Sequence, residues 1–302
     1  MKAKHVIIYL LLVIVTSSCI RDEAPNAEAD ILSCRLPGIT MTTSPIINNN
    51  SVTLFVTPGT NISALAPEFT LTSGATITPA SGTERNFNSP QEYQVTAADG
   101  IWKKTYAISV IDTELATIYN FEDTISGKKY YIFVERENDK VIMEWASGNA
   151  GYAMTGVAKT ADDYPTFQIA NGKNGKCLSL VTRSTGFFGG LVGMPIAAGN
   201  LFIGSFDVNN AMSNPLQATK FGLPFRHVPT YLAGYYKYKA GDQFTEGGKP
   251  VEGKRDICDI YAIMYETSVS VPTLDGTNAF TSPNLVSMAR IKDAKETDEW
   301  TY

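Results

Sequence analysis

Aromatic side chains are the residues of this sequence whose chemistry is easiest to name. Tyrosine and tryptophan rings can bind sugars, because the apolar face of a pyranose stacks on a ring while neighbouring polar groups bind its hydroxyls. The candidate ligand-binding residues are Trp145, Tyr152, Tyr235, Tyr236 and Tyr238. On an extended strand Tyr236 and Tyr238 share one face. Tyr235 shares the other face with Lys237 and Lys239, which predicts an exposed platform there; burial of each ring in a core is the alternative.

Carboxylates offer a second chemistry. Hydrolysis of a glycosidic bond uses two carboxyl groups that flank it, about 5 to 9 Å apart. Asp256 and Asp259 are the best candidates for such a pair. Their odd spacing places them on opposite faces of a regular strand, which makes them weak candidates for a general acid and base. A carboxylate-dependent glycoside hydrolase is therefore the less favoured interpretation.

Other chemistries have little support. Asp207 and Asn209 offer oxygen ligands for a structural calcium ion, although the pattern of an EF-hand loop is missing. They are weak metal candidates. Only two histidines occur, His5 and His227, which excludes a site built from several histidines. The glycines form no phosphate-binding loop or dinucleotide fingerprint, so we expect no cofactor other than that calcium ion.

Composition limits the class of protein. The 302 residues are 44% hydrophobic and 18% charged, which is too apolar for a disordered chain and enough for one large or two ordinary domains. The net charge of -5 provides no basic excess, so we expect no nucleic-acid partner.

The first 18 residues have the pattern of a secretory signal peptide: Lys2 and Lys4, an apolar run, then small residues. The run has about ten residues, half of what a membrane-spanning helix needs. Cys19 follows directly and resembles the acylated cysteine of a bacterial lipobox. We therefore predict a lipid anchor at Cys19, with a plain signal peptide as the alternative.

Residues 19–30 form a polar tether with several acidic side chains. Acidic residues after the lipid cysteine resemble the export signal of Bacteroidota surface lipoproteins, and an ordinary solvated linker is the alternative. We expect an outer-membrane protein exposed on the cell surface, or on the periplasmic face. Three further cysteines, Cys34, Cys177 and Cys258, permit at most one disulfide within the chain. Cys177 with Cys258 is the preferred pair, and buried free thiols are equally compatible.

Residues 31–112 alternate between apolar and polar side chains in short runs bounded by glycine and proline. Val52, Leu54 and Val56, for example, share one face of a strand over residues 51–56. Asp99-Gly100 predicts a hairpin turn in which both positions adopt positive φ. Short, evenly spaced strands predict an immunoglobulin-like β-sandwich.

Four segments of this region resemble a recurring immunoglobulin-like module at the head of Bacteroidota surface lipoproteins. They are ATITPASGT (75–83), FNSP (87–90), YQVTAADG (93–100) and KTY (104–106). The resemblance implies a spacer or interaction domain that carries no catalytic residues.

Residues 118–302 carry longer and more aromatic strands. Over residues 257–266 apolar side chains occupy both faces, which indicates a strand buried on two sides or one lining a ligand groove. Helical periodicity is almost missing from the mature chain. Size and spacing predict an all-β protein whose second, larger domain is a two-sheet jelly roll.

This second region resembles the putative carbohydrate metabolism domain of Bacteroidota lipoproteins. The matching segments are NFED (120–123), WASGNAGYA (145–153), GKCLSLVT (175–182), GLPF (222–225), PTYLAGYYKY (229–238), DICDIYA (256–262) and LDGTN (274–278). The resemblance implies a jelly roll similar to carbohydrate-binding modules, without catalytic residues to transfer. Family members usually continue through further strands, so we expect the C-terminus to be truncated or incomplete in this sequence.

Together these observations predict a lipid-anchored surface protein that binds glycan without cleaving it, in polysaccharide capture or utilisation. The expected partners are a polysaccharide or glycan, the membrane through the lipid anchor, and other surface lipoproteins or an outer-membrane importer. A glycoside hydrolase and an adhesion or fimbrial-type structural protein are the alternatives.

Overall fold

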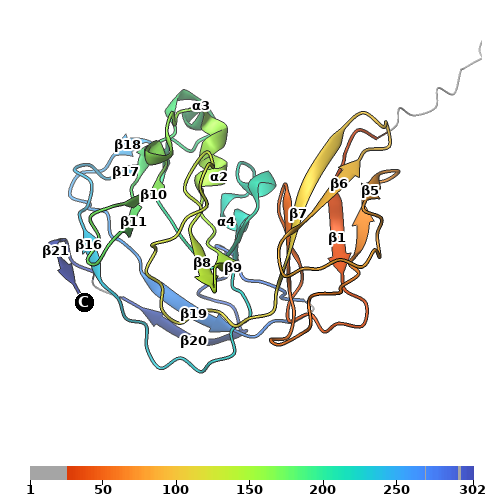
Figure 1. Ribbon diagram of the computed structural model, residues 1–302. Coiled ribbons are helices and arrows are strands. Elements are labelled where there is room, and N and C mark those ends of the chain that lie inside the picture. Colours follow the sequence, from red (N-terminus) through yellow and green to blue (C-terminus); the bar gives the residue numbers. More distant parts are fainter. Residues whose placement is uncertain (1–25, 269, 292–293) are drawn as a thin grey trace, which may run out of the picture.

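The computed structural model describes residues 26–268, 270–291 and 294–302. Two strand-rich domains lie next to each other and are joined by the chain that follows strand β7 (Figure 1). The prediction of an all-β protein is confirmed. The signal peptide, Cys19 and most of the tether lie outside the described residues. Within the described ranges, every helix is too short or too polar to cross a bilayer.

In the first domain a five-stranded sheet packs against a two-stranded one. The large sheet has the order β2 (Ile46–Ile47), β3 (Ser51–Phe55), β7 (Lys103–Ile111), β6 (Gln91–Thr96) and β5 (Thr76–Thr78). The small sheet pairs β1 (Ile31–Arg35) with β4 (Glu68–Leu71). Side chains of β1, β3, β6 and β7 are buried between the sheets, including Val52, Leu54, Tyr93, Ile108 and Val110. Burial of each such side chain stabilises the fold by about 1.5–3 kcal/mol.

The hairpin predicted between β6 and β7 is present, but its turn differs from the expected one. Only Gly100 has positive φ (72°); Asp99 does not. The Asp99 carboxylate instead accepts hydrogen bonds from the backbone N–H groups of Ile101 (2.8 Å) and Trp102 (3.2 Å). Such a turn is possible because the side chain of an asparagine or aspartate can accept a hydrogen bond from the backbone N–H two residues further along the chain.

Asp30 joins the start of the first domain to β7. Its Oδ1 accepts hydrogen bonds from Lys104 Nζ at 2.5 Å and from the Tyr106 hydroxyl at 3.0 Å. The hydrogen bond from Lys104 holds the pKa of Asp30 below its ordinary value of 3.8, although partial burial opposes the shift.

The pH dependence of stability should report this contact. Because the pKa of Asp30 is lower in the folded chain than in the unfolded one, the ionised carboxylate stabilises the fold above its ordinary pKa. That contribution is lost as the pH falls through the folded value. We expect acidification from about pH 5 to about pH 2.5 to lower the melting temperature of the natural chain more than that of Asp30→Asn. Equal pH dependence of the two melting curves, followed by circular dichroism, would contradict this assignment.

The cysteines of the described residues are unpaired: Cys34, Cys177 and Cys258 are free thiols, so the preferred Cys177–Cys258 disulfide is not formed. Burial raises the pKa of Cys34 to about 12. Since the thiolate is the reactive form, Cys34 should resist alkylation by iodoacetamide near pH 8 in the folded protein and react after denaturation. Peptide mass spectrometry of the labelled chain measures this, and rapid native labelling of Cys34 would refute it.

The second domain is built from antiparallel strand pairs. They are β8 (Val134–Glu137) with β9 (Lys140–Glu144), β10 (Thr166–Ile169) with β11 (Cys177–Leu180), β12 (Arg183–Ser184) with β13 (Ile196–Ala197), β14 (Gly204–Phe206) with β15 (Thr219–Phe221), β16 (Tyr236–Tyr238) with β21 (Thr297–Thr301), β17 (Thr245–Glu246) with β18 (Lys249–Pro250), and β19 (Tyr261–Tyr265) with β20 (Leu285–Arg290). The short helices are α2 (Asn149–Tyr152), α3 (Gly186–Leu191) and α4 (Pro215–Ala218). Across the described part of this domain the strands pair two by two, so the two-sheet jelly roll stays a prediction.

The core of this domain includes Phe133, Val134, Ile142 and Met143 of the β8–β9 region. Tyr164 and, further along the chain, Leu274 are also fully buried. A buried polar clamp crosses this core. The Asn149 side chain donates to the Thr166 carbonyl (2.7 Å) and accepts from the Thr166 N–H (3.1 Å).

Two polar contacts connect the second domain with the end of the first domain and the segment that follows it. Asp112, at the end of the first domain, accepts from Lys140 Nζ at 2.7 Å. Glu114 lies 2.9 Å from His227 Nε2. Between these pairs Pro224 and Arg226 line a small cavity with Phe55 of the first domain. The two domains therefore contact each other through side chains as well as through the connecting chain.

Candidate functional site

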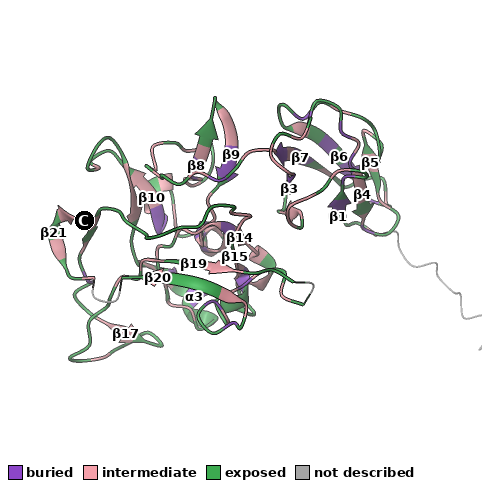
Figure 2. Ribbon diagram, turned by 90° about the horizontal axis from the view of Figure 1, so that it is seen from below, coloured by how far each residue is buried: buried purple, intermediate pink, exposed green. Residues whose placement is uncertain are grey.

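The strand pair β16–β21 brings together residues about sixty positions apart. Tyr236 pairs with Thr301 and Tyr238 with Thr297, and the register shifts between the two pairs. The extra residues of β21 form a bulge, a feature that often re-aims side chains next to functional sites. In Figures 1 and 2, β21 lies at the end of the second domain that is remote from the first domain.

Aromatic rings lie at the surface on one side of this pair. Tyr235 is 50% exposed and Tyr302 is 76% exposed, and their ring centroids are 5.2 Å apart. Lys173 Nζ lies 3.9 Å from the Tyr235 ring centroid, and Lys237 Nζ lies 5.4 Å from the centroid of Trp300. We call Tyr235, Trp300 and Tyr302, with these two lysines, the aromatic face. Rings open to solvent can stack on a flat apolar ligand surface, and the ammonium groups can donate to its hydroxyls.

A polar cleft of about 170 Å³ lies at the end of the same strand pair. It is lined by Tyr238, Lys239, Glu296, Thr297 and Asp298. Burial raises the pKa of Tyr238, and the charges of Asp256 and Glu296 raise it further. The Tyr238 hydroxyl oxygen is buried without a hydrogen-bond partner among the described residues. The hydroxyl is therefore neutral at ordinary pH and lies just beneath the surface of the cleft.

The structure separates the five predicted ligand-binding residues into two groups. Tyr235, Tyr236 and Tyr238 lie together on β16 or beside it, with Tyr235 exposed as its alternation with Lys237 indicates. Trp145 and Tyr152 lie elsewhere in the domain, Trp145 part-buried and Tyr152 buried.

Trp145 packs against Tyr119 and Phe121, with ring centroids 5.0 and 5.5 Å away. Its indole N–H donates to Glu135 Oε1 at 2.8 Å. Tyr152 is buried, and its hydroxyl donates to the Ser184 carbonyl at 2.8 Å. The Tyr152 ring is thus buried, whereas the Trp145 ring is part-buried and covered on one side by Tyr119 and Phe121.

The two predicted carboxylates have separate local roles. Asp259 forms a two-pronged ion pair with Arg290 of β20, with both N···O distances at 2.8 Å. Asp256 is exposed and accepts from the N–H of the next residue, Ile257, at 3.0 Å. The carboxylate of Asp259 is thus occupied by a guanidinium rather than directed toward Asp256.

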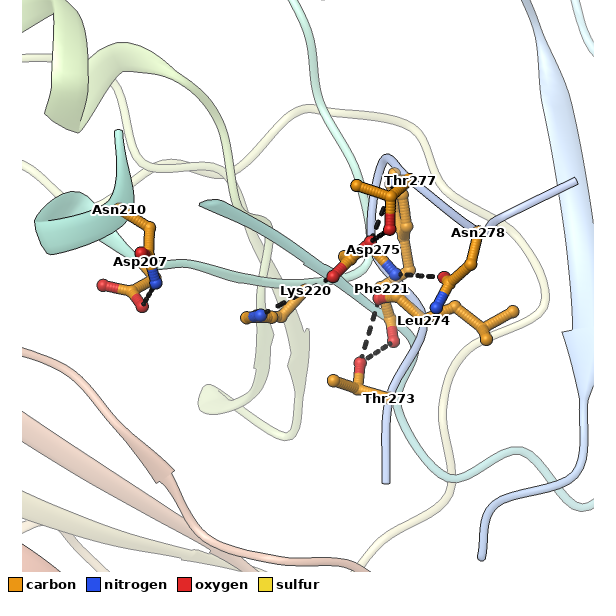
Figure 3. Close-up of polar contacts among 9 residues, drawn as sticks. All are labelled: Asp207, Asn210, Lys220, Phe221, Thr273, Leu274, Asp275, Thr277 and Asn278. Carbon is orange, nitrogen blue, oxygen red and sulfur yellow. Dashed lines mark hydrogen bonds and ion pairs between the residues drawn. The ribbon is translucent and has the colours of Figure 1, made fainter. Parts of the chain in front are cut away.

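Asp207, the metal candidate, acts as a helix cap. Its Oδ1 accepts from the Asn209 N–H at 3.0 Å. Its Oδ2 accepts from Asn210 Nδ2 at 2.7 Å (Figure 3). Nowhere in residues 26–268, 270–291 and 294–302 do three or more His, Cys, Asp or Glu side chains converge as metal ligands. A calcium ion at Asp207 and Asn209 stays a prediction.

The LDGTN segment (274–278) is a structural turn. Asp275 Oδ1 accepts from the Thr277 N–H at 2.9 Å, and Asp275 N–H donates to Asn278 Oδ1 at 2.8 Å (Figure 3). Asp275 also lies 3.9 Å from Lys220 Nζ. At Gly276 a Cβ would lie 2.7 Å from the Leu216 carbonyl oxygen, so this position has no room for a side chain.

Two groups of candidate functional residues were not predicted from the sequence. The aromatic face gains Trp300, Tyr302 and Lys173 only through contacts between segments far apart in the sequence. The two-residue spacing of Trp300 and Tyr302, which places them on one face of a strand, is the sequence feature that could have indicated them. Glu135 is a part-buried carboxylate whose pKa is raised by burial, against the hydrogen bond from Trp145, and further by the charge of Asp123. Glu135 stands two residues after the buried Phe133, and this spacing does not distinguish Glu135 from the other carboxylates of the chain.

Comparison with known proteins adds two family matches. The model of the putative carbohydrate metabolism domain matches residues 120–302, and the model described as "SGBP, N-terminal" matches residues 31–110. The resemblance noted for the second domain is confirmed, and the other match covers the module noted in the first. The chain matches no curated protein.

Two solved structures are similar. One, from Bacteroides thetaiotaomicron and described as a putative glycoside hydrolase, is 85% identical, covers 93% of this chain and 82% of its own, and has a TM-score of 0.89. Another of the same description, from Bacteroides vulgatus, is 48% identical, covers 61% of this chain and 74% of its own, and has a TM-score of 0.57.

Proposed function

The chain belongs to the putative carbohydrate metabolism domain family, and from this membership we propose that its second domain binds a glycan without cleaving it. The observation that carries the proposal is the aromatic face. Exposed rings of Tyr235 and Tyr302 lie beside Trp300, with a lysine ammonium group over two of the three rings. Pyranose rings stack on such surfaces, and the cleft beside it supplies polar groups for hydroxyls.

The first domain supports the same function. Its matched family, "SGBP, N-terminal", refers to surface glycan-binding proteins. A compact domain with its core filled by aliphatic and aromatic side chains suits a spacer between the proposed lipid anchor and the second domain. Bound polysaccharide would then be held near other surface lipoproteins or an outer-membrane importer.

Affinity electrophoresis of residues 26–302 through gels containing plant, mucin or microbial polysaccharides tests glycan binding. We expect retardation on at least one polymer, without new reducing ends, at micromolar affinity of roughly -8 kcal/mol. Free migration on every polymer would refute glycan binding and favour an adhesion or structural role.

Anchoring is the second part of the proposal. Acylation of Cys19 would attach the chain to the outer membrane, exposed at the cell surface. Metabolic labelling with palmitate should mark the natural chain and not Cys19→Ala, and protease added to whole cells should degrade the protein. Equal labelling of both chains would refute acylation at Cys19.

Hydrolysis is a second candidate, because Glu135 combines burial, a raised pKa and a neighbouring carboxylate, Asp123. These are properties of a general acid. The two similar structures, described as putative glycoside hydrolases, favour this candidate as well. New reducing ends that disappear in Glu135→Gln would support it over simple binding.

A further inference from the structure

The hairpin between β6 and β7 ends in two exposed apolar side chains. Ile101 is 78% exposed and Trp102 is 63% exposed. Hydrogen bonds from their backbone N–H groups to Asp99 hold both residues in the loop. We call Ile101 and Trp102 the hairpin tip. A contiguous exposed aliphatic and tryptophan pair is unfavourable in water unless another surface covers it.

The chain enters the first domain beside this tip. The Asp99 N–H donates to the Asn26 carbonyl at 3.3 Å, and Thr72 Oγ1 donates to the Glu28 carbonyl at 2.8 Å. Asn26 is seven residues after Cys19, which an extended chain spans in about 25 Å at most. If Cys19 is acylated, Asn26, which contacts Asp99 in the same hairpin loop as the tip, is held within about 25 Å of the lipid surface.

A second apolar projection lies on the same side of the molecule. Helix α3 exposes Phe187 (84%), together with Leu191 and Val192. In Figure 1, α3 and the hairpin between β6 and β7 both lie at the upper end of the structure. The Asp112–Lys140 ion pair and the Glu114–His227 contact link the domains that carry these projections. One flat surface can therefore meet both projections.

We propose that the hairpin tip and α3 contact the interfacial region of the bilayer in which the chain is anchored. The inference rests on the proposed acylation of Cys19. Tryptophan is favoured at membrane interfaces because its ring is apolar and its N–H can stay hydrated, while Phe187, Leu191 and Ile101 can enter the acyl boundary. The contact would fix the orientation of both domains relative to the membrane, which a lipid anchor alone does not.

Fluorescence quenching by lipid tests the proposal. The acylated full chain is reconstituted into phosphatidylethanolamine and phosphatidylglycerol vesicles that contain a lipid with a shallow nitroxide label. The chain has three tryptophans, Trp102, Trp145 and Trp300. We expect the tryptophan fluorescence of the natural chain and of Trp300→Phe to be quenched. Most of that quenching should be lost in Trp102→Phe. Equal quenching of the natural chain and Trp102→Phe would overturn the contact of the hairpin tip.

Co-sedimentation with the vesicles separates the two hypotheses. A chain that stays on the vesicles while Trp102 is unquenched is anchored, so only the inference fails. A chain that does not stay on the vesicles refutes the anchor, and the inference with it. For α3, Phe187→Trp in the Trp102→Phe background should restore quenching; no restoration would overturn the contact of α3.

Discussion

Replacing Trp300 with alanine is expected to weaken binding of the retarded polysaccharide about tenfold or more, with Tyr235→Ala having a similar effect. A tenfold loss corresponds to about 1.4 kcal/mol, which is within the range of one stacked aromatic ring at an interface. Tyr235 is half exposed and contacts Lys173 and Tyr302 at the surface. Its removal should therefore change the melting temperature little. Affinity electrophoresis at graded polysaccharide concentrations gives the dissociation constants.

Two further variants test whether the loss of affinity is specific to the aromatic face. Trp102→Ala removes an exposed tryptophan of the first domain and should leave polysaccharide affinity unchanged. Trp145→Ala should lower the melting temperature, because Trp145 packs against Tyr119 and Phe121 and donates to Glu135. Unchanged affinity in Trp300→Ala, together with loss of affinity in a stable Trp145→Ala, would place the binding site at Trp145 instead.

Asn149→Ala is expected to lower the free energy of unfolding of the second domain by about 3 kcal/mol. Asn149 is fully buried, and its amide group pairs with both the N–H and the carbonyl of Thr166. Alanine would leave these two backbone groups without partners in the interior, and each unsatisfied buried group costs about 1–3 kcal/mol. Urea unfolding in a Trp102→Phe background measures this domain, because Trp145 and Trp300 then supply all the tryptophan fluorescence.

Asn209→Ala is the matched control, since Asn209 is exposed and only its backbone N–H is bonded, to Asp207. Its unfolding free energy should stay within about 0.5 kcal/mol of the natural chain. A similar small change in Asn149→Ala would show that the clamp does not stabilise the domain. Loss of stability in Asn209→Ala only when calcium is present would instead support the predicted calcium site.

The strand character of the chain follows from local pattern. Alternation of Val52, Leu54 and Val56 marks β3, and the runs on either side of Asp99-Gly100 mark the hairpin of β6 and β7, because side chains of a strand alternate between faces. The turn itself is less predictable. Its conformation depends on whether the Asp99 side chain bonds the backbone, which the residue type permits but does not require.

Local patterns of residues predict that the protein is all-β and resembles a carbohydrate-related family, because alternation and ordered motifs are local properties. Which aromatic residues are accessible to a ligand depends instead on tertiary packing. Tyr152 and Tyr235 are the same residue type, but one packs against Tyr164 and the other lies at the surface beside Tyr302. Alternation tells which side chains share a face, not whether another segment covers that face. That answer depends on pairings such as β16 with β21, which join residues about sixty positions apart.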